Sequence, residues 1–434
     1  MASAGSVLKR LIVGRPFRSD TLGETLLPKK LALPIFASDA MSSVGYATQE
    51  IMLVVAVAGI AAFHFTWYAA VGVVMVMVVV VSAYRQNVRA YPSGGGDYEV
   101  ASVNISKNAG LTVASALAVD YVLTVAVSIS SGVDNLVSAI QPLRPHALWI
   151  AVGLILLITF VNVRGVRDSG KTFAVPVYLF VVSILGMGVF AGIRYLGGAH
   201  LQAETAGYTV VSNSAAPTGL LLFFLLLRAF ASGCTALTGI EAIANGVPAF
   251  KKPKSRNAAT TLLLMGTIAV AMFSTVTILA MSTNVRIVGA GDGVLKRANG
   301  SIVQDQDTVI AQVARAVFGH SIAFYVVTFA TMTILVLAAN TAFNGFPVLA
   351  SILAQDSYLP RQLHTRGDRL AFSNGILVLS GAALLLVIAF NADVTKLIQL
   401  YIVGVFVSFT LSQFGMVRHW NRHLRSERDK RARS

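Results

Sequence analysis

Charge is scarce in this sequence. Only 12% of its 434 residues are Asp, Glu, Lys or Arg, and 55% are hydrophobic, whereas about a quarter of the residues in a soluble domain are charged. Apolar runs of about 20 residues, the length a helix needs to cross a bilayer, recur along the chain. The alternating strands of a membrane barrel, about ten residues each, are not evident. The composition predicts an all-α, polytopic membrane protein.

Residues of covalent and metal chemistry are scarce as well. Cys234 is the only cysteine, which excludes an intrachain disulfide and a Cys-x-x-Cys metal site, and we expect it to pack as a small hydrophobic group. The seven histidines are scattered, and no HExxH or GxSxG motif occurs. The sequence gives little support to an enzyme, and we expect no cofactor.

One glycine-rich stretch, Ser93-Gly94-Gly95-Gly96-Asp97, superficially matches a phosphate-binding loop. It lacks the Gly-Lys-Ser/Thr that completes such a loop. We interpret it as a tightly packed connection.

Ten segments are hydrophobic enough to span a membrane, and polar residues interrupt the first and the sixth. We also expect two short surface helices, one over residues 309–318 on the outer side and one within 348–369 on the inner side. The ten predicted spans are about 31–61, 67–86, 110–140, 147–163, 172–193, 219–247, 258–283, 321–345, 372–391 and 397–418.

Basic residues are distributed unequally between the loops. With the N-terminus placed in the cytoplasm, 26 of the 34 Lys and Arg residues lie on the inner side, seven lie on the outer side, and Arg228 lies within the sixth span. Because cytoplasmic loops are rich in Lys and Arg, this asymmetry predicts that both termini are cytoplasmic. It also explains the net charge of +15 through contact with anionic lipid headgroups, without nucleic acid.

The spans divide into two halves of opposite topology. Residues 31–195 would form a first repeat and residues 219–418 a second, between a cytoplasmic segment 1–30 and a basic cytoplasmic tail 419–434. Each half opens with a broken helix. Inverted repeats of this kind place the substrate site of a transporter at the breaks.

Among the polar side chains of the first broken span, two stand out. Asp39 and Tyr46 supply a carboxylate and a phenol at membrane depth, where an ionisable group normally faces a protein interior or an aqueous path. Helix unwinding would add free backbone carbonyls, and such an oxygen-rich pocket suits a desolvated cation. In the alternative interpretation Asp39 only caps a half-helix.

The third span carries a polar stripe. Asp120, Thr124 and Ser128 are four residues apart, so they share one helix face. In the alternative, the two hydroxyls bond to carbonyls of the preceding turn and Asp120 has a structural partner on a neighbouring helix.

Thr238 and Glu241 share a helix face in the sixth span. Burial favours the protonated form of a carboxyl group and a nearby cation favours the ionised form, so Glu241 is our candidate proton carrier. The alternative is a permanent ion pair with a residue such as Lys251.

Three further residues lie toward the outer side. Tyr401 would close the site from above, unless it belongs to the interfacial aromatic belt. Arg228 needs an acidic partner or a carbonyl, and Asp134 is one candidate for an outer gate with it.

These segments resemble a known family, the KimA-type potassium importers of the KUP branch of the amino acid–polyamine–organocation superfamily. The resemblance covers nearly all of residues 8–420. Its motifs are Lys29–Glu50, Tyr91–Tyr98, Asp120–Ser128, Ser232–Ala242 and Leu400–Trp420.

The resemblance implies a LeuT/APC-like 5+5 inverted repeat and proton-coupled potassium uptake at the plasma membrane. It places proton coupling on Glu241, with Tyr121 nearby. The choice of potassium over other cations comes from the resemblance alone. The cation positions that it implies are Asp39, Tyr46, Thr124, Ser128, Thr238 and Tyr401.

The family continues past the tenth span with two more helices and a cytoplasmic domain that have no counterpart in this sequence. That domain carries inhibition by nucleotide second messengers and much of the dimer contact, so a homodimer stays open here. Two alternatives to potassium–proton symport also stay open: an amino acid permease of the same superfamily and a truncated, non-transporting membrane protein.

Overall fold

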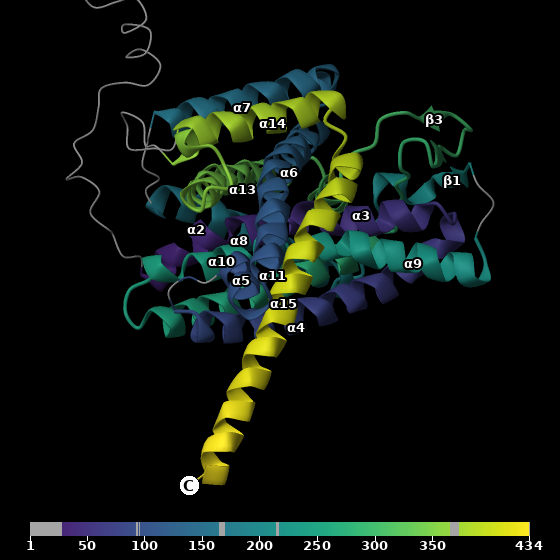
Figure 1. The fold of residues 1–434 in the computed structure, drawn as a ribbon. Coiled ribbons are helices and arrows are strands. Elements are labelled where there is room, and N and C mark those ends of the chain that lie inside the picture. Colours follow the sequence, from purple (N-terminus) through teal and green to yellow (C-terminus); the bar gives the residue numbers. More distant parts are fainter. Residues whose placement is uncertain are drawn as a thin grey trace, which may run out of the picture.

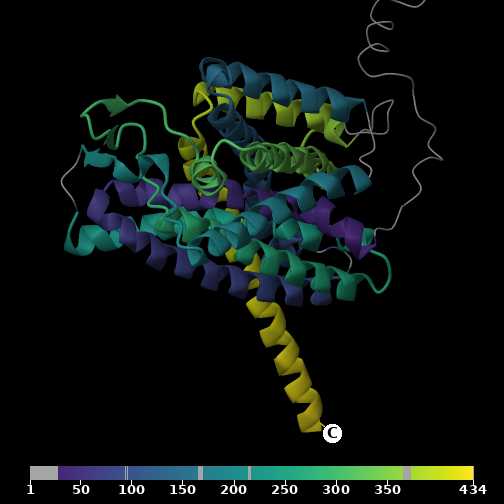
Figure 2. The same ribbon diagram turned by 180° about the vertical axis from the view of Figure 1, so that it is seen from behind.

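A computed structural model describes residues 28–433 except 93, 95, 165–169, 214–216 and 365–372. Most of the predicted N-terminal segment 1–30 therefore lies outside the described residues. The helices form one bundle, and the last of them, α15, extends well beyond it (Figures 1 and 2). Figure 1 shows α7 and α14 side by side along one edge, in agreement with their extensive contact.

The helices follow the predicted spans closely, which confirms the all-α membrane fold. Eight helices of the described chain are long and apolar enough to cross a membrane. The other two predicted spans are the broken pair α2 and α3 and the 17-residue α14. The helices are α2 (Lys29–Ser42), α3 (Val44–Ala56), α4 (Thr66–Ala90), α6 (Lys107–Ala139), α7 (Ala147–Val163), α8 (Gly170–Leu196), α9 (Gly219–Gly233), α10 (Glu241–Asn245), α11 (Lys254–Ser282), α13 (Ile322–Gln355), α14 (Ser373–Ala389) and α15 (Val394–Arg433).

The exterior of the bundle is apolar. On α4, the side chains of Val71, Met75 and Val79 are more than half exposed. On α8, Val182 and Val189 are equally exposed. An exterior of this kind is stable in lipid and unfavourable in water, so the exposed surface supports the membrane assignment.

Small residues allow the central helices to approach closely. Gly132 of α6 follows Ser130 and Ser131, and a methyl group placed on Gly132 would lie 3.5 Å from Leu335 on α13. Close backbone approach through small residues is how helices associate without a hydrophobic driving force between them. The packing of α6 on α13 and α15 forms the centre of the molecule.

A small sheet, which the sequence analysis did not predict, lies at one end of the bundle. It contains β1 (Thr209–Ser212), β2 (Gly293–Lys296) and β3 (Ile302–Val303) in antiparallel order, with Thr209 opposite Lys296. The Ser212 hydroxyl donates to the Val57 carbonyl at 2.8 Å, which ties the sheet to the end of α3. We call this end of the bundle the sheet end. Its other elements are η2 (Ile60–Phe65), η3 (Gln141–His146) and η4 (Glu204–Gly207).

The first predicted surface helix is present with the predicted bounds, but it is not on the surface. It is α12 (Val309–Phe318), and seven of its ten residues are buried. Its backbone is held from both sides, because Thr308 caps the amide of Ala311 at 3.3 Å and Gln49 of α3 accepts from the amide of Val309 at 3.0 Å. The helix is inserted between neighbouring elements.

The second predicted surface helix, within 348–369, is wrong. The α13 helix continues through Gln355, and only the short η7 (Arg361–Leu363) follows before the described residues end at 364. In the predicted cytoplasmic tail 419–434 the chain is helical, because α15 runs unbroken from Val394 to Arg433. The remaining short elements are α5 (Asp97–Asn104), η5 (Cys234–Leu237) and η6 (Val247–Ala249).

Candidate cation site

The break in the first span is confined to Ser43, between α2 and α3. Ser43 keeps right-handed helical angles, φ −62° and ψ −22°. The Ser42 hydroxyl donates to the Asp39 carbonyl and the Ser43 hydroxyl to the Ala40 carbonyl, each at 2.8 Å. The expectation that unwinding frees carbonyls here is therefore wrong, because serine hydroxyls already bond to these two carbonyls.

The break in the sixth span is longer. After η5, Thr238 is extended, with φ −63° and ψ 149°, and Gly239 has a positive φ of +79° before α10 begins at Glu241. A methyl group at Gly239 would lie 2.7 Å from the amide nitrogen of Ala40 and 2.9 Å from the Asp39 side chain. Glycine is required both by the backbone angle and by this contact. The two predicted breaks therefore meet at Asp39.

In the described chain, the Asp39 carboxyl group lacks a hydrogen-bond partner for one of its oxygens. The side chain is 7% exposed, and its Oδ1 atom has no hydrogen-bond partner among the described residues. Asp39 lies in the last turn of α2, whereas the residue that precedes α3 is Ser43. Asp39 is therefore not the N-cap of the second half-helix, and the capping alternative fails.

The hydroxyl side chains of the predicted site are buried as well. Tyr46 of α3 is 2% exposed, and Thr238 Oγ1 donates to the Thr235 carbonyl at 3.0 Å. Thr124 Oγ1 of α6 lies 3.1 Å from the Tyr401 oxygen of α15. Tyr401 is 1% exposed, so it is not part of an interfacial belt. The third-span hydroxyl Ser128 is buried on α6, one turn beyond Thr124.

Glu241 begins α10 and is also buried without a counter-charge. It is 4% exposed, and its Oε2 atom has no hydrogen-bond partner in the described part of the chain. Lys251 is exposed and forms no recorded ion pair with it, so the permanent ion pair is not observed. The charged groups near enough to interact with Glu241 are other acids: Asp120, Asp39 and Asp97. Tyr121, expected near Glu241, does lie within its electrostatic range.

This arrangement has a chemical consequence. Asp39, Asp120 and Glu241 each carry a buried carboxyl oxygen without a hydrogen-bond partner, and their charges interact with one another. Ionised carboxylates buried together are unfavourable unless a cation or a proton neutralises them. The region can therefore hold cations and exchange protons. Within the described residues no three His, Cys, Asp or Glu side chains are arranged to chelate one metal ion.

Asp97 is a central residue that the sequence analysis treated only as part of a loop. The Tyr84 hydroxyl donates to both of its carboxyl oxygens at 2.8 and 2.9 Å, and Ser408 of α15 donates at 2.9 Å. The loop itself is tightly packed as predicted, since a methyl group at Gly94 would meet Pro248 at 2.6 Å. The missed signal was an aspartate at the first position of a helix, directly after the glycine-rich stretch.

The predicted outer gate between Arg228 and Asp134 is wrong. Arg228 is exposed on α9, and no ion pair of it is recorded in the described chain. The basic group near Asp134 is Arg144. Glu50, which the sequence analysis did not single out, is buried nearby and accepts from Thr395 at 3.1 Å.

A different ionic network closes the sheet end. Asp307 accepts from Arg144 at 2.5 Å and from Arg315 at 2.7 Å. Arg315 also donates to the Ser138 carbonyl on α6 at 3.1 Å. The network fixes α12 against α6 and so covers that end of the site.

The family described as amino acid permease matches residues 32–432. The chain belongs to the amino acid permease family. Among characterised permease relatives, the chain is 43% identical over 413 residues to the potassium transporter KimA of Bacillus subtilis (strain 168). The match confirms the predicted resemblance to KimA. It covers 95% of this chain and 65% of KimA, so the chain spans just under two thirds of that relative.

A solved structure is also similar to this permease. The crystal structure of a manganese transporter from Eremococcus coleocola matches with 12% identity and a TM-score of 0.38, over 96% of this chain and 78% of that one. At this TM-score the likeness carries no argument about details. The inverted repeat stays a prediction.

Proposed function

We propose that this permease is a multi-pass plasma-membrane transporter that imports potassium together with protons by alternating access. The observation that carries the proposal is the Asp39 carboxyl group, buried against Gly239 with an oxygen that no group of the described chain satisfies. A desolvated cation would satisfy it. The similarity to a relative named as a potassium transporter supports potassium as that cation.

The cation ligands in this proposal are oxygen atoms from both breaks and from two neighbouring helices. Carboxylate, phenol and hydroxyl oxygens are hard ligands that suit alkali and alkaline-earth cations. A single carboxylate among neutral oxygens favours a monovalent ion over Ca²⁺, whose sites combine several carboxylates with other oxygens. The proposed ligands are Asp39, Tyr46, Thr124, Ser128, Thr238 and Tyr401.

Glu241 is the proposed proton carrier, with Tyr121 beside it. Its charge interacts with that of Asp39, so a cation bound at Asp39 favours the ionised form of Glu241. Protonation of Glu241 in turn relieves the repulsion between the acids. This reciprocity links cation and proton binding without a direct contact, but in the sense of competition. The proposed symport therefore also requires that access alternates only when both Asp39 has its cation and Glu241 its proton.

Burial of the site supports alternating access. The exposed fraction of each proposed ligand side chain is at most 7%, so the structure corresponds to a state closed on both sides. We place both termini in the cytoplasm, as the basic residues of the loops predict, which makes the sheet end extracellular. Transport then requires the Arg144–Asp307–Arg315 network to open on that side.

One observation favours a second candidate. The family match is to amino acid permeases, so an amino acid is the alternative substrate. A substrate carboxylate would be repelled by Asp39 and its acidic neighbours, which disfavours this candidate.

Uptake into proteoliposomes tests the proposal. We expect rubidium or potassium uptake that an inward proton gradient stimulates, no uptake of labelled amino acids, and loss of uptake in Asp39→Asn. The matched control is Asp305→Asn. The Asp305 side chain is 73% exposed, and its ion-pair partner is Arg144, which is not a proposed ligand. Amino acid uptake without potassium flux would replace the proposal by a permease function. Normal uptake by Asp39→Asn would remove Asp39 from the site.

A further inference from the structure

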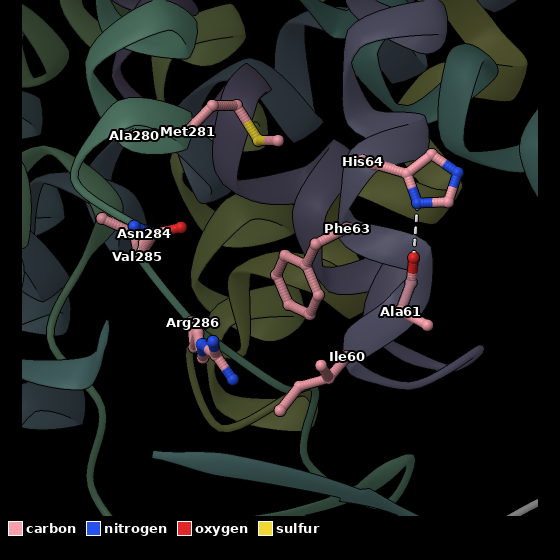
Figure 3. A pocket seen from close by; sticks show the side chains of 9 residues that line it. All are labelled: Ile60, Ala61, Phe63, His64, Ala280, Met281, Asn284, Val285 and Arg286. Atoms are coloured by element: carbon pink, nitrogen blue, oxygen red, sulfur yellow. Dashed lines mark hydrogen bonds between the residues drawn. The ribbon is translucent and has the colours of Figure 1, made fainter. Parts of the chain in front are cut away.

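A cavity of about 250 Å³ opens at the sheet end, away from the cation site. It lies where α11 ends and η2 leads into α4, so it sits at the ends of two membrane helices. In the view of Figure 3, the Phe63 ring stands between Arg286, from the segment after α11, and His64 of η2. The apolar part of the lining includes Ile60, Phe63 and Met281.

The polar part of the lining is positive. Arg286 is partly buried, and its Nη1 donates to the Tyr208 carbonyl at 3.0 Å, which fixes the guanidinium group. No Asp or Glu forms an ion pair with it among the residues that the structure describes. The other donors of the guanidinium group are thus available at the cavity.

Two more polar side chains line the cavity. His64 Nδ1 donates to the Ala61 carbonyl at 2.5 Å, so Nε2 of the neutral ring is left as an acceptor for a hydroxyl group of a ligand. Asn284 supplies an amide and is held in the left-handed region, with φ +55°. Arginine and amide donors without a carboxylate form an anion site, and the planar guanidinium matches phosphate oxygens in particular.

The position of the cavity indicates which anion binds there. Trp67 and Tyr68, on the first turn of α4, are 42% and 70% exposed. Exposed aromatic side chains at the end of a membrane helix mark the bilayer interface. At about 250 Å³ the cavity is smaller than the roughly 300–1,000 Å³ of a pocket for a drug-sized ligand. It therefore suits a headgroup whose acyl chains remain in the bilayer.

We propose that the cavity between η2 and the end of α11 binds the phosphate of an anionic phospholipid, with Arg286 as the main ligand, Asn284 as an auxiliary donor and His64 Nε2 as an acceptor for a hydroxyl group of the headgroup. The apolar wall of Phe63 and Met281 contacts the glycerol region. Because Arg286 also donates from its backbone amide to Thr205 at 2.9 Å, bound lipid stabilises the connection between α11 and the sheet. This site does not depend on which substrate the protein transports.

The test is lipid binding to the purified full chain in detergent, measured by native mass spectrometry with short-chain phosphatidylglycerol. Loss of a charged hydrogen bond predicts an affinity about tenfold lower in Arg286→Gln. Arg286→Lys should lose less, and Ala61→Trp should block the cavity with the charges intact. Lys296→Gln is the matched control, since it removes one charge from the same end but does not line the cavity.

Thermal melting of each variant separates lost binding from lost folding. Selective retention of phosphatidylglycerol over phosphatidylcholine, lost in Arg286→Gln and in Ala61→Trp but kept in Lys296→Gln, supports the site. Equal lipid affinity of Arg286→Gln and Lys296→Gln overturns it. Displacement of the lipid by an equal concentration of inorganic phosphate overturns the lipid as the occupant and leaves a site for free anions.

Discussion

Gly239 lies so close to Asp39 that a single methyl group at residue 239 would approach the Asp39 Cγ atom to 2.9 Å. The contact joins the two broken spans and fixes the carboxyl group that the proposed cation site requires.

Gly239→Ala should abolish uptake. The substitution adds a clash to a positive φ, and a non-glycine residue in such a conformation costs about 1–3 kcal/mol by itself. Gly198→Ala is the control, because Gly198 has a similar φ of +82° and open space around it. We expect a lower melting temperature in both variants and lost uptake only in Gly239→Ala. Equal uptake by the two would show that the contact with Asp39 has no role.

Glu241→Gln should keep cation binding and lose the response to a proton gradient. A glutamine has nearly the same shape but cannot exchange the proton. Potassium binding by calorimetry should persist across pH, while uptake with and without an inward proton gradient should become equal. A variant that remains fully gradient-stimulated would eliminate Glu241 as the carrier.

Tyr401→Phe should weaken cation uptake moderately. It removes the oxygen that lies 3.1 Å from Thr124 and keeps the buried ring. The loss of one hydrogen-bonding oxygen, about 0.5–1.5 kcal/mol, corresponds to a KM for potassium up to about tenfold higher. Tyr98→Phe is the control, since the Tyr98 hydroxyl bonds to Asp356 in an exposed setting. An unchanged KM in Tyr401→Phe would exclude Tyr401 as a ligand.

Asp307→Asn should loosen α12. Its carboxylate contacts both Arg144 and Arg315, and removal of one partner of a largely buried ion pair leaves charges uncompensated. Hydrogen–deuterium exchange should become faster in residues 309–318. Asp305→Asn should not change the exchange, because Asp305 is 73% exposed and lies 3.9 Å from Arg144. Equal protection of α12 in the two variants would argue against the network as its anchor.

Asp97→Asn should lower the stability of the protein and make that stability depend less on pH. Burial raises the pKa of Asp97 above its ordinary value, although the hydroxyl groups that donate to it oppose the shift. The folded chain then binds this proton more tightly than the unfolded chain does, so the contribution of Asp97 to stability falls as pH rises from the ordinary pKa toward the raised one.

An asparagine removes that pH dependence. Its one side-chain oxygen can accept from both Tyr84 and Ser408, but a buried NH2 group replaces the other carboxyl oxygen, and burial of that group without an acceptor costs about 1–3 kcal/mol. The measurement is the melting temperature of wild type and variant from acidic to neutral pH. Asp356→Asn, at an exposed tyrosine-bonded aspartate, is the control. Parallel pH profiles of wild type and Asp97→Asn would contradict the assignment.

The sequence by itself determined the helices. Apolar runs of the right length are local, so the bounds of α7 and α12 could be predicted to the residue. The unusual acids and hydroxyls of the first, third and sixth spans were also visible, because a polar group at membrane depth is costly wherever it packs. The two interruptions of the apolar runs, near Ser43 and Gly239, followed from the same pattern.

Only the tertiary structure decided which side chains meet. Asp97 accepts a hydrogen bond from Ser408, and Glu50 accepts one from Thr395. In each pair the two residues are more than 300 positions apart in the sequence. The burial of α12, the three-stranded sheet and the pairing of Asp307 with Arg144 and Arg315 depend on the same long-range packing. A pattern along the chain records how costly a polar residue is in lipid. Which partner a buried polar residue finds depends on where helices distant in sequence cross, and the sequence alone does not give those crossings.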